Sequence, residues 1–319
     1  MPTFNELLRA SFKSKDTEEW LDVHFTRPVG LVFALLWNRL GLHPNVITIV
    51  SIFLGAAAGY MFAFSDLPHN VAGVVLLMFA NFCDSTDGQM ARLSGKKTLL
   101  GRVLDGFSGD VWFFCIYVAI IVRLYGQPMP GTTHAWGVWG LVLALIAGLL
   151  CHSPQASLSD YYRQIHLFFL KGKEGSELDS YRQQRDIRDS LPKSEWLARI
   201  FYYFYGNYCK SQEKRTPAFQ KFFALWNQAR AERPGDARLE QIRQELLDGS
   251  RPLMKYTNLL TFNLRAIVIY VTCLLGCPWA YLLFEIVVLT ALYVRMHKRH
   301  ETLCGRLAKE LEQGAKAAE

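Results

Sequence analysis

Six apolar stretches constrain this sequence more than any other feature. They cover residues 46–64, 71–82, 111–122, 136–151, 266–277 and 279–294. A helix needs about 20 residues to cross the hydrocarbon core of a membrane, where only helices and closed barrels satisfy their backbone groups. The second, third and fifth stretches reach that length only if the polar residues at their ends are also helical. The sequence therefore predicts an all-α integral membrane protein with six transmembrane helices.

The composition agrees with a membrane protein that has a substantial part in water. The 319 residues are 51% hydrophobic and 20% charged, with a net charge of +7. Such a chain is too apolar to be disordered and too charged to lie wholly in lipid. The seven cysteines do not fit a secreted disulfide framework, because their number is odd and most lie in apolar runs. The first twenty residues have no apolar core typical of a signal peptide, so we expect no cleaved signal.

The basic residues predict the orientation. With a cytoplasmic N-terminus, the outer loops fall near 65–70, 123–135 and 277–279, and Arg123 is their one Lys or Arg, whereas 160–257 holds 18. Basic loops favour the cytoplasmic side, so we expect both termini to be cytoplasmic, in a bacterial inner membrane or the endoplasmic reticulum. In this orientation we expect Trp136, Trp139 and Trp279 to lie near the outer surface of the membrane. Topology and anionic lipid explain the basic excess, so no nucleic-acid partner is expected.

The predicted organisation has five segments. They are an N-terminal cytoplasmic and interfacial segment (1–44), transmembrane helices 1–4 (45–159), a cytoplasmic helical insertion between helices 4 and 5 (160–257), transmembrane helices 5–6 (258–297) and a cytoplasmic tail (298–319). In the first segment, FNELLRASF and GLVFALLWNRLG are typical of amphipathic helices in the headgroup plane. The insertion contains an aromatic and basic run, WLARIFYYFYGNYCK, and a helix predicted to begin after Asp236 and end at Gly249.

Three acidic residues in the second and third spans predict a metal site. Asp84 and Asp87 are three residues apart and share a helix face. A turn at Ser94 leads into the next helix, where Asp105 follows Gly101 by four residues, so an antiparallel hairpin brings the three carboxylates together. Carboxylates this close repel one another unless a cation lies between them. Oxygen ligands favour Mg²⁺, Mn²⁺ or Ca²⁺ over zinc.

Small residues and one arginine accompany the carboxylates. Gly88 and Ala91 continue the acidic face without bulk, and Arg92 is suited to a phosphate. The residues alone therefore indicate a divalent metal and a phosphorylated ligand at a membrane surface. A polar hairpin with snorkelling charges fits less well, because Asp within apolar helices is rare without a role. A transporter fits less well too, because the cluster lies in one hairpin at the membrane surface and has no second copy.

The pattern Asp84-x2-Asp87-Gly88-x2-Ala91-Arg92-x8-Gly101-x3-Asp105 resembles the signature of the CDP-alcohol phosphotransferase family, D-x2-D-G-x2-A-R-x8-G-x3-D-x3-D. The His43-Pro44-Asn45 start of the first span is also similar to that family. The resemblance implies a phospholipid-synthesis transferase that moves a phosphatidyl group from a CDP-alcohol, first CDP-diacylglycerol, to an alcohol such as inositol or inositol phosphate, releasing CMP. Alternatives are transfer of a phospho-alcohol head group to diacylglycerol or ceramide, and an inactive metal-binding scaffold.

The resemblance also implies roles for single residues and a homodimer. It implies two Mg²⁺ or Mn²⁺ ions, held by Asp84, Asp87, Asp105 and Asp110. It implies a nucleotide pocket lined by Gly88, Ala91, Arg92 and Gly101. The lipid bilayer, the CDP-alcohol and a small alcohol or polyol are the other partners expected.

The last aspartate of the signature departs from the family pattern. Gly109 stands at its position, and Asp110 follows one residue later, about 140° around an ideal helix from Asp105. A π-bulge would bring Asp110 onto the face of Asp105, and Gly106 makes the backbone pliable there. We therefore expect Asp110 to act with Asp105 in catalysis, as the general base that the resemblance implies. Otherwise this role falls to Ser108, to a water, or is missing.

A second polar group lies at the start of the fifth span. Asn258, Thr261 and Arg265 follow one another at i, i+3 and i+7 and form a polar stripe on a continuous helix. If Arg265 faces the bundle, it is suited to hold a phosphate of the acceptor. Snorkelling to the headgroups is the equal alternative. Arg163, after the fourth span, completes the predicted acceptor site.

Overall fold

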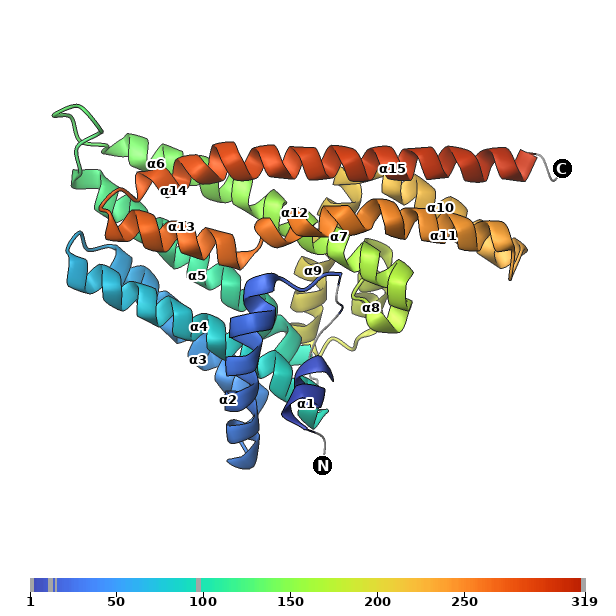
Figure 1. The fold of residues 1–319 in the computed structure, drawn as a ribbon, viewed down its shortest axis with the longest axis horizontal. Helices are drawn as coiled ribbons and strands as arrows, with labels where there is room; N and C mark the ends of the chain where they lie inside the picture. Colours follow the sequence, from blue (N-terminus) through green and yellow to red (C-terminus); the bar gives the residue numbers. More distant parts are fainter. Residues whose placement is uncertain (1–2, 11–13, 15, 96–98, 317–319) are drawn as a thin grey trace. The chain divides into compact units, whose positions relative to one another are not determined.

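The computed structural model describes residues 3–10, 14, 16–95 and 99–316, and every regular element in these ranges is a helix (Figure 1). Six helices are long and apolar enough to cross a membrane: Pro44–Phe62, Leu67–Ser94, Val103–Gly126, Val138–Lys171, Ala237–Leu274 and Trp279–Gly314. The predicted all-α fold with six spans is confirmed. The chain is a multi-pass integral membrane protein.

The chain divides into two compact units. The first contains Met1–Pro154 and Thr261–Thr290, and the second contains Gln155–Leu260 and Ala291–Glu319. The predicted insertion, residues 160–257, lies wholly within the second unit. The acidic cluster of the signature lies wholly within the first.

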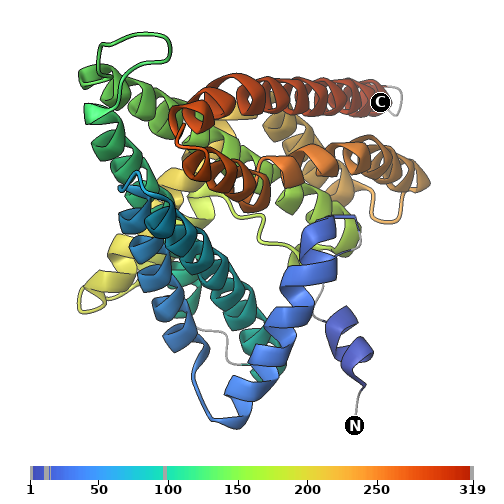
Figure 2. The ribbon, with the colours of Figure 1, turned by 60° about the vertical axis from the view of Figure 1, so that its left-hand side comes forward.

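The first unit is a bundle of helices around an apolar core. Its elements are α1 (Phe4–Ala10), η1 (Asp22–Thr26), α2 (Arg27–Arg39), α3 (Pro44–Phe62), α4 (Leu67–Ser94), α5 (Leu99–Gly126), α6 (Val138–Leu145), η2 (Ile146–His152), α13 (Phe262–Leu274), α14 (Trp279–Phe284) and η5 (Glu285–Leu289). α3 packs against both α4 and α5, and α2 packs on α4. Figures 1 and 2 show α3 and α4 side by side from two directions. The two helices predicted in the N-terminal segment correspond to α1 and α2.

A close contact between α3 and α5 fixes the position of α5 along α3, and with it the position of the acidic residues on α5. The indole of Trp112 lies over Gly55, so closely that a Cβ atom on Gly55 would be 2.0 Å from a ring carbon. The indole N–H donates a hydrogen bond to the carbonyl of Ser51 at 3.0 Å. Because only glycine leaves this space free, α5 approaches the backbone of α3 directly.

Short polar side chains begin the first two spans. The ring of His43 accepts the N–H of Asn45 at 3.2 Å before α3, and Asp66 accepts the N–H of His69 at 3.1 Å before α4. Hydrogen bonds from the His69 side chain and backbone lower the pKa of Asp66 from its ordinary value. Both residues act as N-caps, which satisfy backbone donors that have no partner in the helix.

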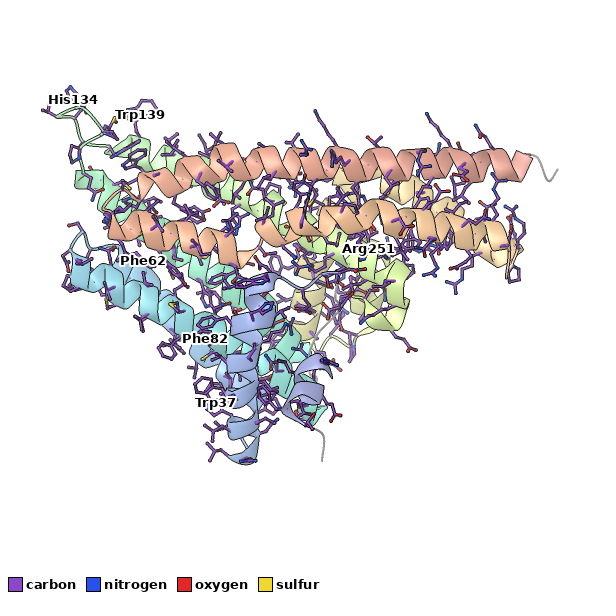
Figure 3. The ribbon with its side chains drawn as sticks, viewed as in Figure 1. Trp37, Phe62, Phe82, His134, Trp139 and Arg251 are labelled. Carbon is purple, nitrogen blue, oxygen red and sulfur yellow. The ribbon has the colours of Figure 1, made fainter. Side chains whose placement is uncertain are left out.

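The tryptophans expected near the outer membrane surface lie in the first unit. His134 and Trp139 lie at the end formed by the connection from α5 to α6, far from Trp37 (Figure 3). The rings of Trp136 and Trp279 lie 6.3 Å apart. Their placement near the outer membrane surface stays a prediction.

Arg123 differs from its predicted position in an outer loop. α5 continues to Gly126, and the Arg123 side chain is buried within the first unit. It donates hydrogen bonds to Asn70 Oδ1 at 2.7 Å and to the carbonyl of Cys273 at 3.2 Å. These partners satisfy Nη1 and Nη2 of the buried guanidinium, which lowers the cost of burying its charge.

The second unit is also helical. Its elements are α7 (Ser153–Lys171), η3 (Lys173–Gly175), α8 (Tyr181–Ser190), α9 (Trp196–Arg215), α10 (Pro217–Glu232), α11 (Ala237–Ser250), η4 (Arg251–Leu253), α12 (Met254–Leu259) and α15 (Thr290–Lys316). Asp236 caps α11 as predicted, accepting the N–H of Arg238 at 2.9 Å. The predicted end at Gly249 is wrong, because α11 continues to Ser250. Gly249 serves packing instead: a Cβ atom there would lie 2.6 Å from the side chain of Leu303.

Candidate functional site

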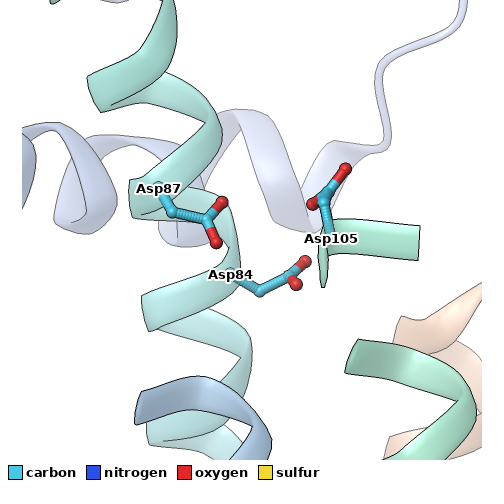
Figure 4. Close-up of side chains that lie close together, drawn as sticks. All are labelled: Asp84, Asp87 and Asp105. Atoms are coloured by element: carbon cyan, nitrogen blue, oxygen red, sulfur yellow. The ribbon is translucent and has the colours of Figure 1, made fainter. Parts of the chain in front are cut away.

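Three carboxylates meet where α4 faces α5. Asp84 and Asp87 project from α4 toward Asp105 on α5 (Figure 4). One oxygen from each lies within 4.8 Å of the others. Asp87 is buried, Asp84 is half-buried and Asp105 is exposed. The group therefore opens to the outside of the first unit through Asp105.

Two buried hydroxyl groups hold the carboxylates in place. Thr48 on α3 donates a hydrogen bond to Asp87 Oδ2. Ser108 on α5 donates to Asp84 Oδ1 at 2.8 Å. Sequence reasoning did not find Thr48, because no spacing along the chain links the first span to the acidic residues of the second. The one weak signal in the sequence is that Thr48, a hydroxyl residue, lies one turn after the start of the apolar helix α3.

Arg92 lies next to this group on the same helix. A Cβ atom on Gly88 would be 3.3 Å from Nη1 of Arg92, so the absence of a side chain on Gly88 lets the guanidinium pack close to α4. Nε of Arg92 is buried and has no hydrogen-bond partner within the described part of the chain. Buried donors are normally satisfied. An unsatisfied guanidinium N–H fits an anionic ligand. The other two predicted pocket residues are half-buried, Ala91 on α4 and Gly101 in the first turn of α5.

The predicted π-bulge near Asp110 is absent. α5 is a regular α-helix from Leu99 to Gly126. Nothing lies within 4 Å of a Cβ atom built on Gly109, and Ser108 reaches Asp84 from the regular helix, so no contact forces a bulge. Asp110 is exposed and does not belong to the group of three carboxylates. Its catalytic role stays a prediction.

The predicted acceptor residues do not form one stripe. The helix breaks after Leu259, and Thr261 has an extended backbone as the N-cap of α13. The expectation of a continuous helical face through Asn258, Thr261 and Arg265 was therefore wrong. Within the second unit, Nη2 of Arg163 donates to Asn258 Oδ1 at 3.4 Å, so the structure brings these two residues together.

Arg265 lies inside the first unit and forms an ion pair with Glu285. The Arg265 side chain is 1% exposed, which excludes snorkelling to the headgroups. The hydroxyl of Tyr117 donates to Glu285 Oε2 at 3.0 Å, and Nδ1 of His152 lies 3.1 Å from Nη1 of Arg265. Sequence reasoning missed Glu285, although a single acidic residue within the apolar run 279–294 is a usable signal.

Two π-helical turns carry this buried ion pair. η2 ends at His152 and η5 begins at Glu285, and the two turns pack against each other. A π-turn re-aims side chains relative to a regular helix and is frequent at functional sites. Here the two turns direct His152 and Glu285 toward Arg265.

The segment that carries the carboxylates matches a family model, and the chain is similar to several known proteins. Residues 41–161 match the family model described as CDP-alcohol phosphatidyltransferase. The "CDP-diacylglycerol--inositol 3-phosphatidyltransferase 1" of Arabidopsis thaliana is 25% identical over 159 residues, 50% of this chain and 55% of that protein. The "Probable CDP-diacylglycerol--inositol 3-phosphatidyltransferase 2" of the same plant is 26% identical over 174 residues, 53% of this chain and 61% of that protein.

An archaeal protein is similar over a shorter segment. The "Bifunctional IPC transferase and DIPP synthase" of Archaeoglobus fulgidus is 30% identical over 112 residues, 35% of this chain and 21% of that protein. The chain thus spans less than two thirds of the length of each of these relatives. No solved structure gives a significant match to the chain.

Proposed function

We propose that this chain, whose residues 41–161 match the CDP-alcohol phosphatidyltransferase family model, transfers the phosphoryl-alcohol part of a CDP-alcohol to a second alcohol and releases CMP. The observation that carries the proposal is the group of Asp84, Asp87 and Asp105, which stand at the signature positions and have oxygens within 4.8 Å of one another. The names of the plant relatives favour CDP-diacylglycerol as the donor and inositol as the first acceptor to test.

The donor set fits a hard divalent cation. Asp84, Asp87 and Asp105 offer carboxylate oxygens, which Mg²⁺ and Mn²⁺ prefer. The hydroxyls of Thr48 and Ser108 donate hydrogen bonds to Asp87 and Asp84. Such supporting hydrogen bonds orient the ligands of metal sites. A divalent cation held by Asp84, Asp87 and Asp105 would neutralise pyrophosphate charge and stabilise the departing CMP. The resemblance implies two ions, and Gly109 in place of a fourth carboxylate gives the second ion fewer ligands.

The chain's own residues bind the pyrophosphate and take up the proton. Arg92 offers a buried N–H to a phosphate oxygen, and the absence of a side chain on Gly88 leaves room for the guanidinium. The attacking hydroxyl needs a proton acceptor within hydrogen-bond reach. Asp105 is the exposed member of the group and is our first candidate. Asp110 is the second, because a regular helix turns it about 140° away from Asp105.

We propose the same topology and assembly that the sequence predicts. The distribution of basic residues supports cytoplasmic N- and C-termini. The family resemblance supports a homodimer. An inactive metal-binding scaffold is the second candidate function, and the specific observation in its favour is Gly109 at the position of the last signature aspartate.

The test is CMP release by the purified protein in detergent with Mg²⁺, CDP-diacylglycerol and a panel of alcohols. We expect one alcohol to drive release and Asp84→Asn to abolish it. Asp186→Asn is the matched control, because this carboxylate is exposed on α8. Metal binding without CMP release from any CDP-alcohol, including donors with small head groups tested against diacylglycerol, would favour the scaffold.

A further inference from the structure

The helix α9 lies in the inserted segment, beyond the residues that match the family. One face packs inside the second unit through Gly206, Cys209 and Gln212, which are buried. The amide of Gln212 donates to the carbonyl of Ser157 at 3.0 Å, and the hydroxyl of Tyr205 donates to Asp179 at 3.0 Å. Burial raises the pKa of the Cys209 thiol to about 12. These contacts fix which face of α9 points outward.

The outward face of α9 carries large apolar and aromatic side chains. They are Trp196 (59% exposed), Leu197 (66%), Ile200 (47%), Tyr203 (52%), Phe204 (66%) and Tyr208 (40%). At 3.6 residues per turn these six positions fall within an arc of about 140°. Single exposed apolar residues are ordinary on a protein surface, but a contiguous apolar face of this kind marks an interaction site.

We propose that this face of α9 docks on the surface of an anionic lipid bilayer, with the helix in the plane of the headgroups. The chain that carries α9 also has six candidate spans, and α9 is not one of them. Because these spans hold the chain in a membrane, α9 always belongs to a membrane-embedded protein. Trp and Tyr combine an apolar ring with a polar group, which suits them to the boundary between acyl chains and headgroups.

The positive charge beside the apolar face of α9 favours anionic lipids. The exposed face continues into Lys210 and Lys214 at the last turns of α9, and Lys193 is exposed just before the helix. Glu213, the one acidic residue of α9, is half-buried and accepts the backbone N–H of Tyr181 at 2.8 Å. Residues 181–215, from α8 to the end of α9, hold eight basic and four acidic residues. An apolar face bordered by lysines is typical of helices that adsorb to anionic membranes.

A photo-crosslinking amino acid in the full-length protein tests the proposal. Phe204→p-benzoylphenylalanine, reconstituted in nanodiscs of phosphatidylcholine and phosphatidylglycerol, should give lipid adducts on the α9 peptide. Asn227→p-benzoylphenylalanine, at an exposed polar position of α10, is the matched control. We expect at least a fivefold higher lipid-adduct yield at position 204 than at position 227.

Lipid composition and the lysines provide the second comparison. Nanodiscs of phosphatidylcholine alone, or the added substitutions Lys210→Gln and Lys214→Gln, should lower the lipid-adduct yield at position 204 at least threefold. Equal yields in both lipid mixtures would overturn the assignment of an anionic surface. Adducts to a second copy of the chain, or lipid yields equal to those at position 227, would overturn membrane docking altogether.

Discussion

The guanidinium of Arg265 pairs with the carboxylate of Glu285 where the two side chains are 1% and 0% exposed. Tyr117 donates a further hydrogen bond to Glu285, and His152 lies within hydrogen-bond distance of Arg265. Removing either partner of a buried ion pair leaves an uncompensated charge away from water. The pair therefore ties α13 to the π-helical turn η5 within the first unit.

Glu285→Gln should destabilise the protein by about 3–5 kcal/mol, because Arg265 then keeps its charge without a carboxylate. The melting temperature in detergent, followed by size-exclusion chromatography of the heated protein, measures this effect. The double variant Arg265→Met/Glu285→Leu removes both charges and should recover most of the loss. A Glu285→Gln protein that melts with the wild type would contradict a stabilising role for the pair.

Thr48→Val should weaken binding of a divalent cation by roughly 10–100-fold, because it removes the hydroxyl that orients Asp87. Binding of Mn²⁺ to the purified protein, measured by electron paramagnetic resonance, reports the change without reference to activity. Thr48→Ser keeps the hydroxyl and should bind nearly as well as the wild type. If Val and Ser variants bind Mn²⁺ equally, the hydrogen bond to Asp87 does not support the site.

Asp105→Asn should lower CMP release by at least about 100-fold, whereas Asp110→Asn should retain most of it. The reason is that a regular α5 turns Asp110 about 140° away from the carboxylate group. Initial rates of CMP release for the two variants show whether Asp110 is required for catalysis. If Asp110→Asn is as inactive as Asp105→Asn, then Asp110 is the general base and α5 rearranges when substrate binds.

Gly55→Ala should destabilise the protein by about 1–3 kcal/mol, the usual range for overpacking. The new methyl group would lie 2.0 Å from the Trp112 ring, which is held by its hydrogen bond to Ser51 and has no room to move aside freely. Gly126→Ala is the matched control, because nothing lies within 4 Å of a Cβ atom there. Melting temperatures in detergent compare the two, and equal values would show that the α3–α5 contact relaxes easily.

Some residues that are close in sequence were placed correctly from the sequence, whereas the π-bulge at Asp110 and the stripe from Asn258 to Arg265 were not. Asp84 and Asp87 share a helix face by spacing, and Asp105 lies close to both, as the sequence predicts. Apolar length, with helical polar ends added to three of the stretches, was sufficient to predict six spans. These predictions succeed because helical periodicity and hydropathy are local properties of the chain.

Partners that come from distant helices could not be predicted in this way. Thr48 donates a hydrogen bond to Asp87 from another span. Glu285 pairs with Arg265 from a π-helical turn, and no residue pattern predicts this turn. The break before Thr261 also went unnoticed, because no Gly or Pro marks it. Each of these features depends on packing between helices rather than on the sequence nearby.

Removal of divalent cations should lower the melting temperature of the wild-type protein. Three carboxylates with oxygens within 4.8 Å of one another repel when no cation neutralises them. A cation that binds only the folded protein at 100 times its Kd adds about 2.7 kcal/mol to stability. Asp84→Asn/Asp105→Asn should therefore melt at one temperature with and without Mg²⁺, while Asp186→Asn keeps the wild-type shift. A Mg²⁺ shift that survives in the double variant would place the cation outside this group of carboxylates.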